Sequence, residues 1–223
     1  MERGRHRSGE ARTWPDEAPH PDSVPAVVSM PAAALSPARS HLVVVGFMGA
    51  GKSTVGRLIA ERTGRPFVDL DDAIAEEAGQ CIADFIRKSG AVALKAKERA
   101  VLRRLLASSQ PLVIATGGET FLDTTVRDWL RVRAHTVFLE AEPETLVRRL
   151  SAGNPLQQRP VKPGPNLVET VRRQLVGVTP IYREASLTVH NDGERIEEVV
   201  GEIARQLRLD RTEHGRTPRR AAG

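Results

Sequence analysis

Residues 46–53 read Gly-Phe-Met-Gly-Ala-Gly-Lys-Ser, and this segment constrains the fold more than any other part of the sequence. It matches the pattern G-x-x-x-x-G-K-S, with an apolar run at 42–45 before it and an amphipathic stretch at 52–63 after it. A glycine-rich turn between a buried strand and a helix directs several backbone N–H groups, and the positive end of the helix dipole, at one point. The segment therefore predicts a phosphate loop.

Two side chains of this loop have chemistry of their own. In loops of this kind the lysine contacts the β- and γ-phosphates, and the serine hydroxyl is a ligand of Mg²⁺. Lys52 and Ser53 stand at these positions. We therefore expect ATP and Mg²⁺ as cofactors. The residues expected to hold the ATP phosphates are Gly46, Gly49, Ala50, Gly51, Lys52, Ser53 and Thr54.

Short apolar runs alternate with amphipathic stretches over most of the chain. Strands are expected at 42–45, 67–69, 112–115, 136–139 and 187–189. Helices are expected at 52–63, 71–78, 81–107 with a break near 90, 123–131, 143–151, 166–178 and 195–208. Buried strands separated by crossover helices predict an α/β fold whose parallel sheet is covered on both faces and binds ligands at the carboxyl ends of its strands.

The two ends of the chain differ from its body in composition. Residues 1–40 are rich in Pro, Ala, Ser and charge without a period, which predicts a disordered extension. Residues 205–223 contain six Arg against two acids, and a disordered basic tail is expected at 209–223. The body, 41–204, is nearly neutral with 22 basic and 21 acidic residues, although the chain carries +5 overall. Nucleic acid is therefore not expected as a partner.

The composition also bears on the location of the protein. No run of 18 apolar residues occurs, so no membrane span is expected, and the N-terminus lacks the apolar stretch of a signal peptide. Cys81 is the only cysteine, which excludes an intrachain disulfide and argues against a cysteine-based zinc site, and we expect it to be packed in a helix. A reducing cytoplasm suits this usage. We expect a cytoplasmic monomer.

Acidic residues follow the second expected strand. Asp69 and Asp71 are one residue apart, and alternate residues of an extended segment point the same way. Two carboxylates converging near a phosphate loop suit phosphoryl transfer, with Asp69 near Mg²⁺ and Asp71 near the acceptor hydroxyl. Capping of a helix N-terminus, by Asp71 and Asp72, is an alternative that the pattern leaves open.

Two further segments fall where ligands of such a sheet bind. Thr116-Gly117-Gly118 ends the third strand, where backbone can approach a ligand closely. The polar, proline-rich stretch 151–165 contains Arg159 and is typical of a lid that closes over the transferred phosphate. An ordinary strand-to-helix turn and a loop with an incidental arginine are the alternatives.

Together these segments resemble the shikimate kinase family over residues 42–207. The resemblance rests on residues 46–57, 67–71, 115–118, 159–160 and 180–183. It implies a P-loop NTPase fold of the nucleoside-monophosphate-kinase type at 41–208. Such a fold has a five-stranded parallel sheet in the order 2-3-1-4-5, helices on both faces and a lid.

The resemblance also assigns roles to side chains. It implies that Lys52 and Arg159 stabilise charge on the transferred phosphate, and that Asp71 orients or deprotonates the acceptor hydroxyl. Asp69 acts through Mg²⁺ and its waters, and Arg149 lies against adenine. The resemblance thus predicts a kinase that phosphorylates a hydroxyl of a small molecule.

The sequence departs from the family's pattern on the acceptor side. The family's Phe-Arg-x-x-Glu is Leu-Lys-Ala-Lys-Glu at 94–98, so that Lys95 replaces an arginine. Its third glycine after the third strand is Glu119, and its arginine before Pro-Leu-Tyr is Val178. In shikimate kinases these positions surround the substrate carboxylate and ring. The residues expected around the acceptor are Asp71, Lys95, Gly117, Gly118 and Glu119.

The departures leave three functions open. An arginine grips a carboxylate by two parallel hydrogen bonds, whereas Lys95 is a point charge and Glu119 repels a carboxylate. The acceptor is then either shikimate, bound by Lys95 and other groups, or a related cyclic polyol that is neutral or bears an amine with Glu119 as its partner. The alternative from another class is an ATP-binding pseudokinase that serves as an interaction module. The presence of the transfer residues argues against that alternative.

Overall fold

The computed structural model describes residues 40–152, 166–193 and 195–209. The expected lid with Arg159, and nearly all of both expected disordered ends, lie outside these residues. Ser40 and Leu209, the innermost residue of each expected extension, are among the described residues. Ser40 is buried and its carbonyl accepts a hydrogen bond from Arg65, and Leu209 is buried and donates its N–H to the carbonyl of Ala204.

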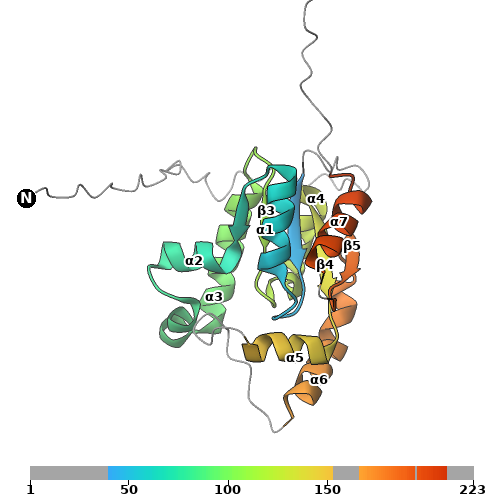
Figure 1. Ribbon diagram of the computed structural model, residues 1–223. Coiled ribbons are helices and arrows are strands. Elements are labelled where there is room, and N and C mark those ends of the chain that lie inside the picture. The colour runs from blue at the N-terminus through green and yellow to red at the C-terminus, as the bar shows by residue number, and fades with distance from the viewer. Residues whose placement is uncertain (1–39, 153–165, 194, 210–223) are drawn as a thin grey trace, which may run out of the picture.

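Five parallel strands form one sheet in the order β2-β3-β1-β4-β5 (Figure 1), which confirms the predicted order. The strands are β1 (His41–Val45), β2 (Phe67–Asp69), β3 (Val113–Ala115), β4 (Ala134–Glu140) and β5 (Leu187–His190). β1 lies at the centre and is buried along its whole length, because helices cover both faces of the sheet. β4 begins two residues earlier than expected and pairs Ala134 with His41.

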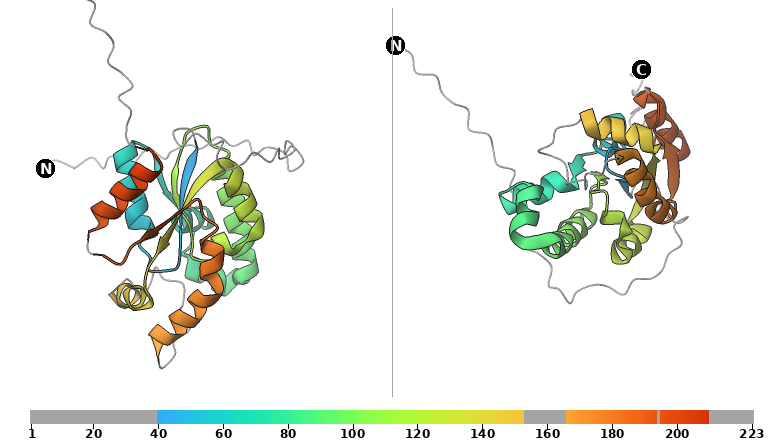
Figure 2. Two further views of the ribbon diagram at one scale, coloured as in Figure 1. Left: turned by 90° about the vertical axis from the view of Figure 1, so that its right-hand side faces the viewer. Right: turned by 90° about the horizontal axis from the view of Figure 1, so that it is seen from below.

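Helices connect the strands and cover the sheet. They are α1 (Lys52–Thr63), α2 (Leu70–Ala78), α3 (Ile82–Leu106), α4 (Thr124–Arg133), α5 (Pro143–Ala152), α6 (Leu167–Tyr182) and α7 (Ile196–Gln206). A short 3₁₀ helix that the sequence pattern did not predict, η2 (Thr120–Leu122), precedes α4. α1 and α7 lie on one side of the sheet and α3 and α4 on the other (Figure 2, left).

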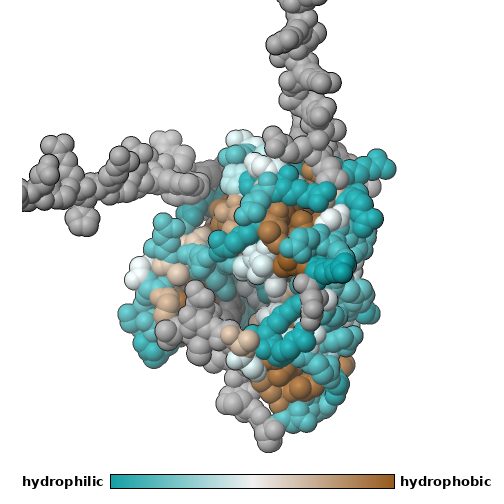
Figure 3. Space-filling model, in the orientation of Figure 1, coloured by the Kyte–Doolittle hydropathy of each residue, from teal (hydrophilic) through white to brown (hydrophobic). Residues whose placement is uncertain are grey.

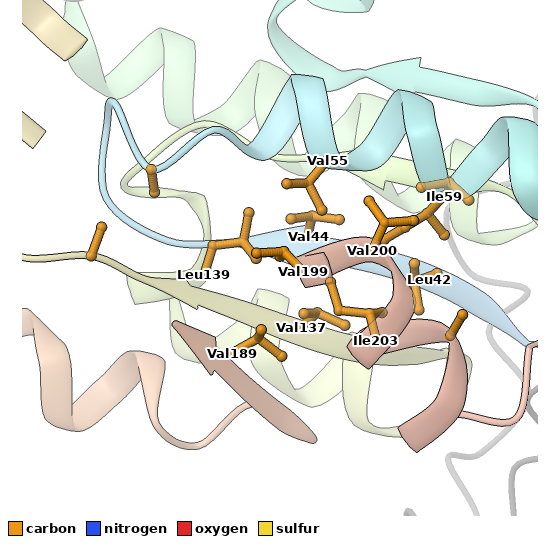
Figure 4. Close-up of a cluster of buried hydrophobic side chains, with 14 of the residues drawn as sticks. Leu42, Val44, Val55, Ile59, Val137, Leu139, Val189, Val199, Val200 and Ile203 are labelled. Atoms are coloured by element: carbon orange, nitrogen blue, oxygen red, sulfur yellow. The ribbon is translucent and has the colours of Figure 1, made fainter. Parts of the chain in front are cut away.

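The core is divided by the sheet because side chains of a strand alternate between its faces. Leu42 and Val44 of β1 pack with α1 and α7, as Figure 4 shows. Val43 and Val45 of the same strand pack in a second cluster with α2, α3 and α4. The apolar run of β1 therefore supplies both halves of the core and holds the residues that follow it, the phosphate loop, at the carboxyl edge of the sheet.

α3 and α6 are both irregular: α3 is broken at Gly90, which was expected, and α6 contains a proline, Pro180, beyond its expected end. The expected break in the second helical stretch is confirmed, because Gly90 inside α3 has φ 82° and ψ 165°. α6 was expected to end at 178 but continues through Pro180 to Tyr182. The N–H of Arg183 still donates to the carbonyl of Thr179, and the Tyr182 ring stacks on Phe138 with centroids 5.0 Å apart. Burial of this ring extends the helix past the proline.

The surface is mainly hydrophilic on the side seen in Figure 3, with a hydrophobic area over α6 at the lower end. Val176 of this helix is 75% exposed. Cys81, which precedes α3, is exposed and not packed as expected, because it occupies the N-cap position outside the helix. Within the described residues, no helix is both long and apolar enough to span a membrane.

Candidate active site

The phosphate loop leaves β1 at Gly46 and enters α1 at Lys52. Gly46, Gly49 and Gly51 have positive φ values of 142°, 80° and 90°. A Cβ on Gly46 would lie 2.7 Å from the carbonyl oxygen of Leu139, and one on Gly49 would lie 3.1 Å from that of Leu146. The loop is therefore packed backbone against backbone on β4 and α5, a conformation that requires glycine.

The first turn of α1 carries the polar side chains of the loop. Gly51 caps the helix without a side chain, which leaves the first N–H groups of α1 for a ligand. The Lys52 ammonium donates to the carbonyl of Phe47 at 3.0 Å and so lies across the loop. Ala50 is fully buried, whereas Thr54 is exposed on the first turn. A cradle of backbone N–H groups with one ammonium fits the phosphates of ATP.

Ser53 and Asp69 meet beside this cradle. The Ser53 hydroxyl donates to Oδ2 of Asp69 at 2.5 Å, which joins α1 to the end of β2. Mg²⁺ takes oxygen ligands and is usually held by one or two protein oxygens together with phosphates and waters. In the part of the chain that the structure describes, no cluster of three or more His, Cys, Asp or Glu could hold a metal by itself. The Ser53–Asp69 pair therefore fits a Mg²⁺ ion shared with a nucleotide.

Asp71 lies in the first turn of α2, near the start of the helix expected at 71–78. The premise that Asp69 and Asp71 share an extended segment is wrong, because α2 begins at Leu70 and Asp71 is in its first turn. Asp69 is the N-cap, and its Oδ1 accepts the N–H of Asp71 at 3.1 Å. An aspartate thus caps the N-terminus of this helix, as the alternative proposed, but the residue is Asp69 and not Asp71 or Asp72. One carboxylate both starts α2 and contacts Ser53.

The turn after β3 lies against the phosphate loop. A Cβ on Gly118 would lie 3.4 Å from the backbone nitrogen of Met48, and Gly117 is buried. The hydroxyl of Thr116 donates to the carbonyl of Val44, and the hydroxyl of Tyr182 donates to the carbonyl of Gly118. Side chains from both sides thus fix the Thr-Gly-Gly turn beside the loop. Tyr182 belongs to the segment 180–183 that carries the family resemblance, but no local pattern in the sequence predicts this contact.

Lys95 and Glu119, two of the acceptor-side residues that differ from the family pattern, lie close together. The Lys95 ammonium of α3 is 3.8 Å from a carboxylate oxygen of Glu119, and both side chains are more than half exposed. Glu119 precedes η2 and directly follows Gly118. Val178, the third departure, is partly buried and packs against both apolar clusters. The two charges therefore compensate each other, and no cation occupies position 178.

Arg149 lies on α5, next to the loop. Its Nη1 atom is buried and has no hydrogen-bond partner among the described residues. Burial lowers the pKa of its guanidinium, and the charge of Asp192 opposes this. A buried N–H group without a partner costs free energy, which a ligand acceptor such as a purine nitrogen would recover. The position therefore fits the expected adenine contact.

The helices frame this site from two sides. Seen from below, α2 and α3 lie on one side of the carboxyl end of the sheet, and α5 and α6 on the other (Figure 2, right). The first side carries Asp71 and Lys95, and the second carries Arg149. The structure thus brings the predicted residues to one edge of the sheet, except for Arg159, which lies outside the described residues.

The family model described as shikimate kinase matches residues 48–208 of this chain. The chain belongs to the shikimate kinase family. A shikimate kinase of Symbiobacterium thermophilum is 39% identical over 176 residues, covering 78% of this chain and 99% of the relative. A shikimate kinase of Thermus thermophilus is 38% identical over 166 residues, covering 74% and 89%.

Solved structures agree with this membership. A shikimate kinase from Acinetobacter baumannii in complex with shikimate has a TM-score of 0.71 and 30% identity, covering 82% of this chain and 100% of that chain. A shikimate kinase from Bacteroides thetaiotaomicron has a TM-score of 0.68 and 28% identity, covering 76% and 98%. As a shikimate kinase family member, the chain is a phosphotransferase that acts on a hydroxyl group and uses ATP and Mg²⁺. The comparisons do not support the pseudokinase alternative.

Proposed function

We propose that the chain transfers the γ-phosphoryl group of ATP to a hydroxyl of shikimate or of a related cyclic polyol. The observation that carries this proposal is the contact of 2.5 Å between Ser53 and Asp69, with Asp71 in the turn that Asp69 caps. This arrangement sets a metal-binding pair and a further carboxylate beside one phosphate loop. The pair also serves nucleotide binding, but the further carboxylate is a group that transfer to a hydroxyl needs and nucleotide binding alone does not.

The roles of the side chains follow from the balance of the reaction. The acceptor oxygen forms a bond to the γ-phosphorus, the bond from that phosphorus to the β–γ bridging oxygen breaks, and ADP leaves. The acceptor proton passes to the carboxylate of Asp71. Bound Mg²⁺ neutralises phosphate charge, and Lys52 does so from the loop. We assign Arg159 the same task on the basis of the family resemblance.

The Lys95–Glu119 pair supports an acceptor without a carboxylate. A substrate carboxylate would have to share Lys95 with Glu119, and Val178 offers it no second cation. A substrate ammonium would likewise share Glu119 with Lys95. A neutral cyclic polyol leaves the pair intact, and an amine-bearing one needs only a shift of the exposed Lys95. We therefore propose a neutral or amine-bearing cyclitol, rather than shikimate, as the preferred acceptor.

The test is acceptor-dependent release of ADP, measured by a coupled assay with shikimate, a neutral cyclitol and an aminocyclitol. Turnover with at least one of them, abolished in Asp71→Asn, supports the kinase assignment. Binding of ATP without turnover of any of the three would contradict it. Strong turnover of shikimate with a micromolar KM would leave the kinase assignment intact but refute the preferred acceptor class.

A charge variant separates the acceptor classes further. In Glu119→Gly the ammonium of Lys95 is released, and charge-assisted hydrogen bonds contribute about 1.5–3 kcal/mol. We expect kcat/KM for shikimate to rise about tenfold, and activity on an aminocyclitol to fall. Arg99→Gln is a matched control, because it removes another ion pair of α3, the one with Asp123, without changing Lys95 or Glu119. Equal effects of both substitutions would indicate a general loosening of α3.

A further inference from the structure

Asn191 follows β5, at the edge of the sheet opposite β2, and contacts the phosphate loop. The residue is 3% exposed. Its backbone N–H donates to the carbonyl of Glu140 at 2.8 Å, which continues the pairing of β5 with β4. Its side-chain amide donates to the carbonyl oxygen of Ala50 at 2.7 Å. No local pattern in the sequence predicts this contact, because its two partners lie 141 positions apart.

The geometry points to Asn191 as a positioning residue for the phosphate loop. The carbonyl of Ala50 and the N–H of Gly51 belong to the same peptide group, and in a trans peptide they point in opposite directions. The structure contains no cis peptide among its described residues. A hydrogen bond that holds the Ala50 oxygen toward β5 therefore holds the Gly51 N–H away from β5, on the phosphate side of the loop.

The surroundings make this bond hard to replace. Ala50 is fully buried, so without Asn191 its carbonyl would lose a partner where water is excluded. Gly51 has φ 90°, and a Cβ there would lie 2.8 Å from the side-chain nitrogen of Asn191. The amide thus occupies the space that a side chain at 51 would need. It secures a left-handed backbone conformation that is one of several open to glycine.

The Asn191 bond links residues 46–52 of the loop to β5, as the Ser53–Asp69 bond links the end of the loop to β2. The N–H of Ala50 and the ammonium of Lys52 both donate to the carbonyl of Phe47. These two bonds join loop residues to one another, so the loop could keep them while moving as a unit. The bond from Asn191 ties the loop to the sheet. It therefore sets where the cradle lies relative to Arg149 and the rest of the nucleotide site.

The proposal is tested with Asn191→Asp and Asn191→Ala in the full chain. The Asp side chain has the same shape but places a carboxylate oxygen against the Ala50 carbonyl, and the Ala side chain leaves that carbonyl unpaired. We expect the Kd for Mg–ADP, measured by titration calorimetry well below each variant's unfolding midpoint, to rise about tenfold, and more for Asp than for Ala. The KM for ATP should rise in parallel, while the KM for the acceptor stays unchanged.

His190→Ala is the matched control, because His190 precedes Asn191 but is exposed on β5. It should bind Mg–ADP like the wild-type chain. A lower unfolding midpoint with a wild-type Kd for Mg–ADP in Asn191→Ala would show a purely structural residue and overturn the proposal. So would an equal loss of affinity in His190→Ala. If the Asp variant does not fold, the Ala variant decides by the same two measurements. The readout is nucleotide binding, so it does not depend on the identity of the acceptor.

Discussion

Asp69 has two contacts that substitution can separate. Its Oδ1 caps α2 through the N–H of Asp71, and its Oδ2 accepts the hydroxyl of Ser53, where we place Mg²⁺. In Asp69→Asn the amide oxygen can still cap the helix, and the amide nitrogen can donate to the Ser53 oxygen. Both contacts of the free protein are then kept, but the negative charge is lost. Asp69→Ala removes the cap and the charge together.

The expected magnitudes differ for the two substitutions. Replacing an Asp N-cap by Ala costs about 1 kcal/mol, and Asn is as good a cap as Asp. For a domain of this size about 1 kcal/mol lowers the unfolding midpoint by about 2–4 °C. Asp69→Asn also loses an attraction to the helix dipole but relieves repulsion from Asp71 and Asp72, so its midpoint should change little. Loss of a charged metal ligand at about 1.5–3 kcal/mol predicts about a tenfold or larger rise in the Mg²⁺ needed for activity.

Two measurements on both variants check this reasoning. Thermal unfolding without nucleotide reports the cap, and the Mg²⁺ dependence of ADP release at saturating ATP reports the metal site. We expect only Asp69→Ala to unfold earlier, and both variants to need more Mg²⁺. Ser53→Ala is a comparison that removes the other proposed ligand and leaves the cap intact. Equal midpoints for the Asn and Ala variants would refute the capping role, and a wild-type Mg²⁺ dependence in Asp69→Asn would refute the metal role.

Three further substitutions test other parts of the fold and the site. Tyr182→Phe should lower the free energy of unfolding in urea by about 1–2 kcal/mol and raise the KM for the acceptor, because the carbonyl of Gly118 loses its donor. An unchanged KM would show that this turn does not take part in acceptor binding. Burial lowers the pKa of His41, whose Nδ1 accepts the Leu112 N–H. As the pH falls, this histidine therefore takes up a proton in the unfolded chain before it does so in the folded chain. Stability should therefore be full above the ordinary pKa of 6.5 and decline below it, and the decline should shrink in His41→Asn, which keeps an acceptor; urea titrations at several pH values decide. Gly46→Ala should abolish ATP binding in calorimetry, because the new Cβ would meet the carbonyl of Leu139 at 2.7 Å.

The sheet could be predicted because its signals are local and redundant. The run at 42–45 is apolar at every position, as a central strand buried on both faces requires, and a phosphate loop follows it directly. α1 ends at Thr63, as expected, and Gly64 follows it in the left-handed conformation that commonly ends a helix. The strand order, by contrast, came from the family resemblance, because hydrophobic periodicity says nothing about which strands are neighbours.

Predictions failed where a choice between local structures depends on tertiary contacts. An extended segment and a capped helix start both accommodate residues 69–71, and the hydrogen bond from Asp71 to Asp69 decides for the helix. The helix was expected to end at 178, but α6 continues through Pro180, although proline weakens a helix interior. Burial of the Tyr182 ring against Phe138 outweighs that cost, and no local pattern could indicate it. Contacts of this kind need the fold before they can be found.

The acceptor side illustrates the same limit in its chemistry. Taken one at a time, Lys95 binds a carboxylate less firmly than an arginine and Glu119 repels it, so each departure alone disfavours a substrate carboxylate. Their side chains lie 3.8 Å apart, and each therefore removes part of the other's effect on a substrate. Because both are exposed, the pair itself contributes little stability, about 0–1 kcal/mol. The pair lies at the edge of the expected acceptor site and contributes little stability. Its effect on the substrate, namely that Lys95 paired with Glu119 attracts a carboxylate less strongly, therefore explains the two residues better than their mutual contact does.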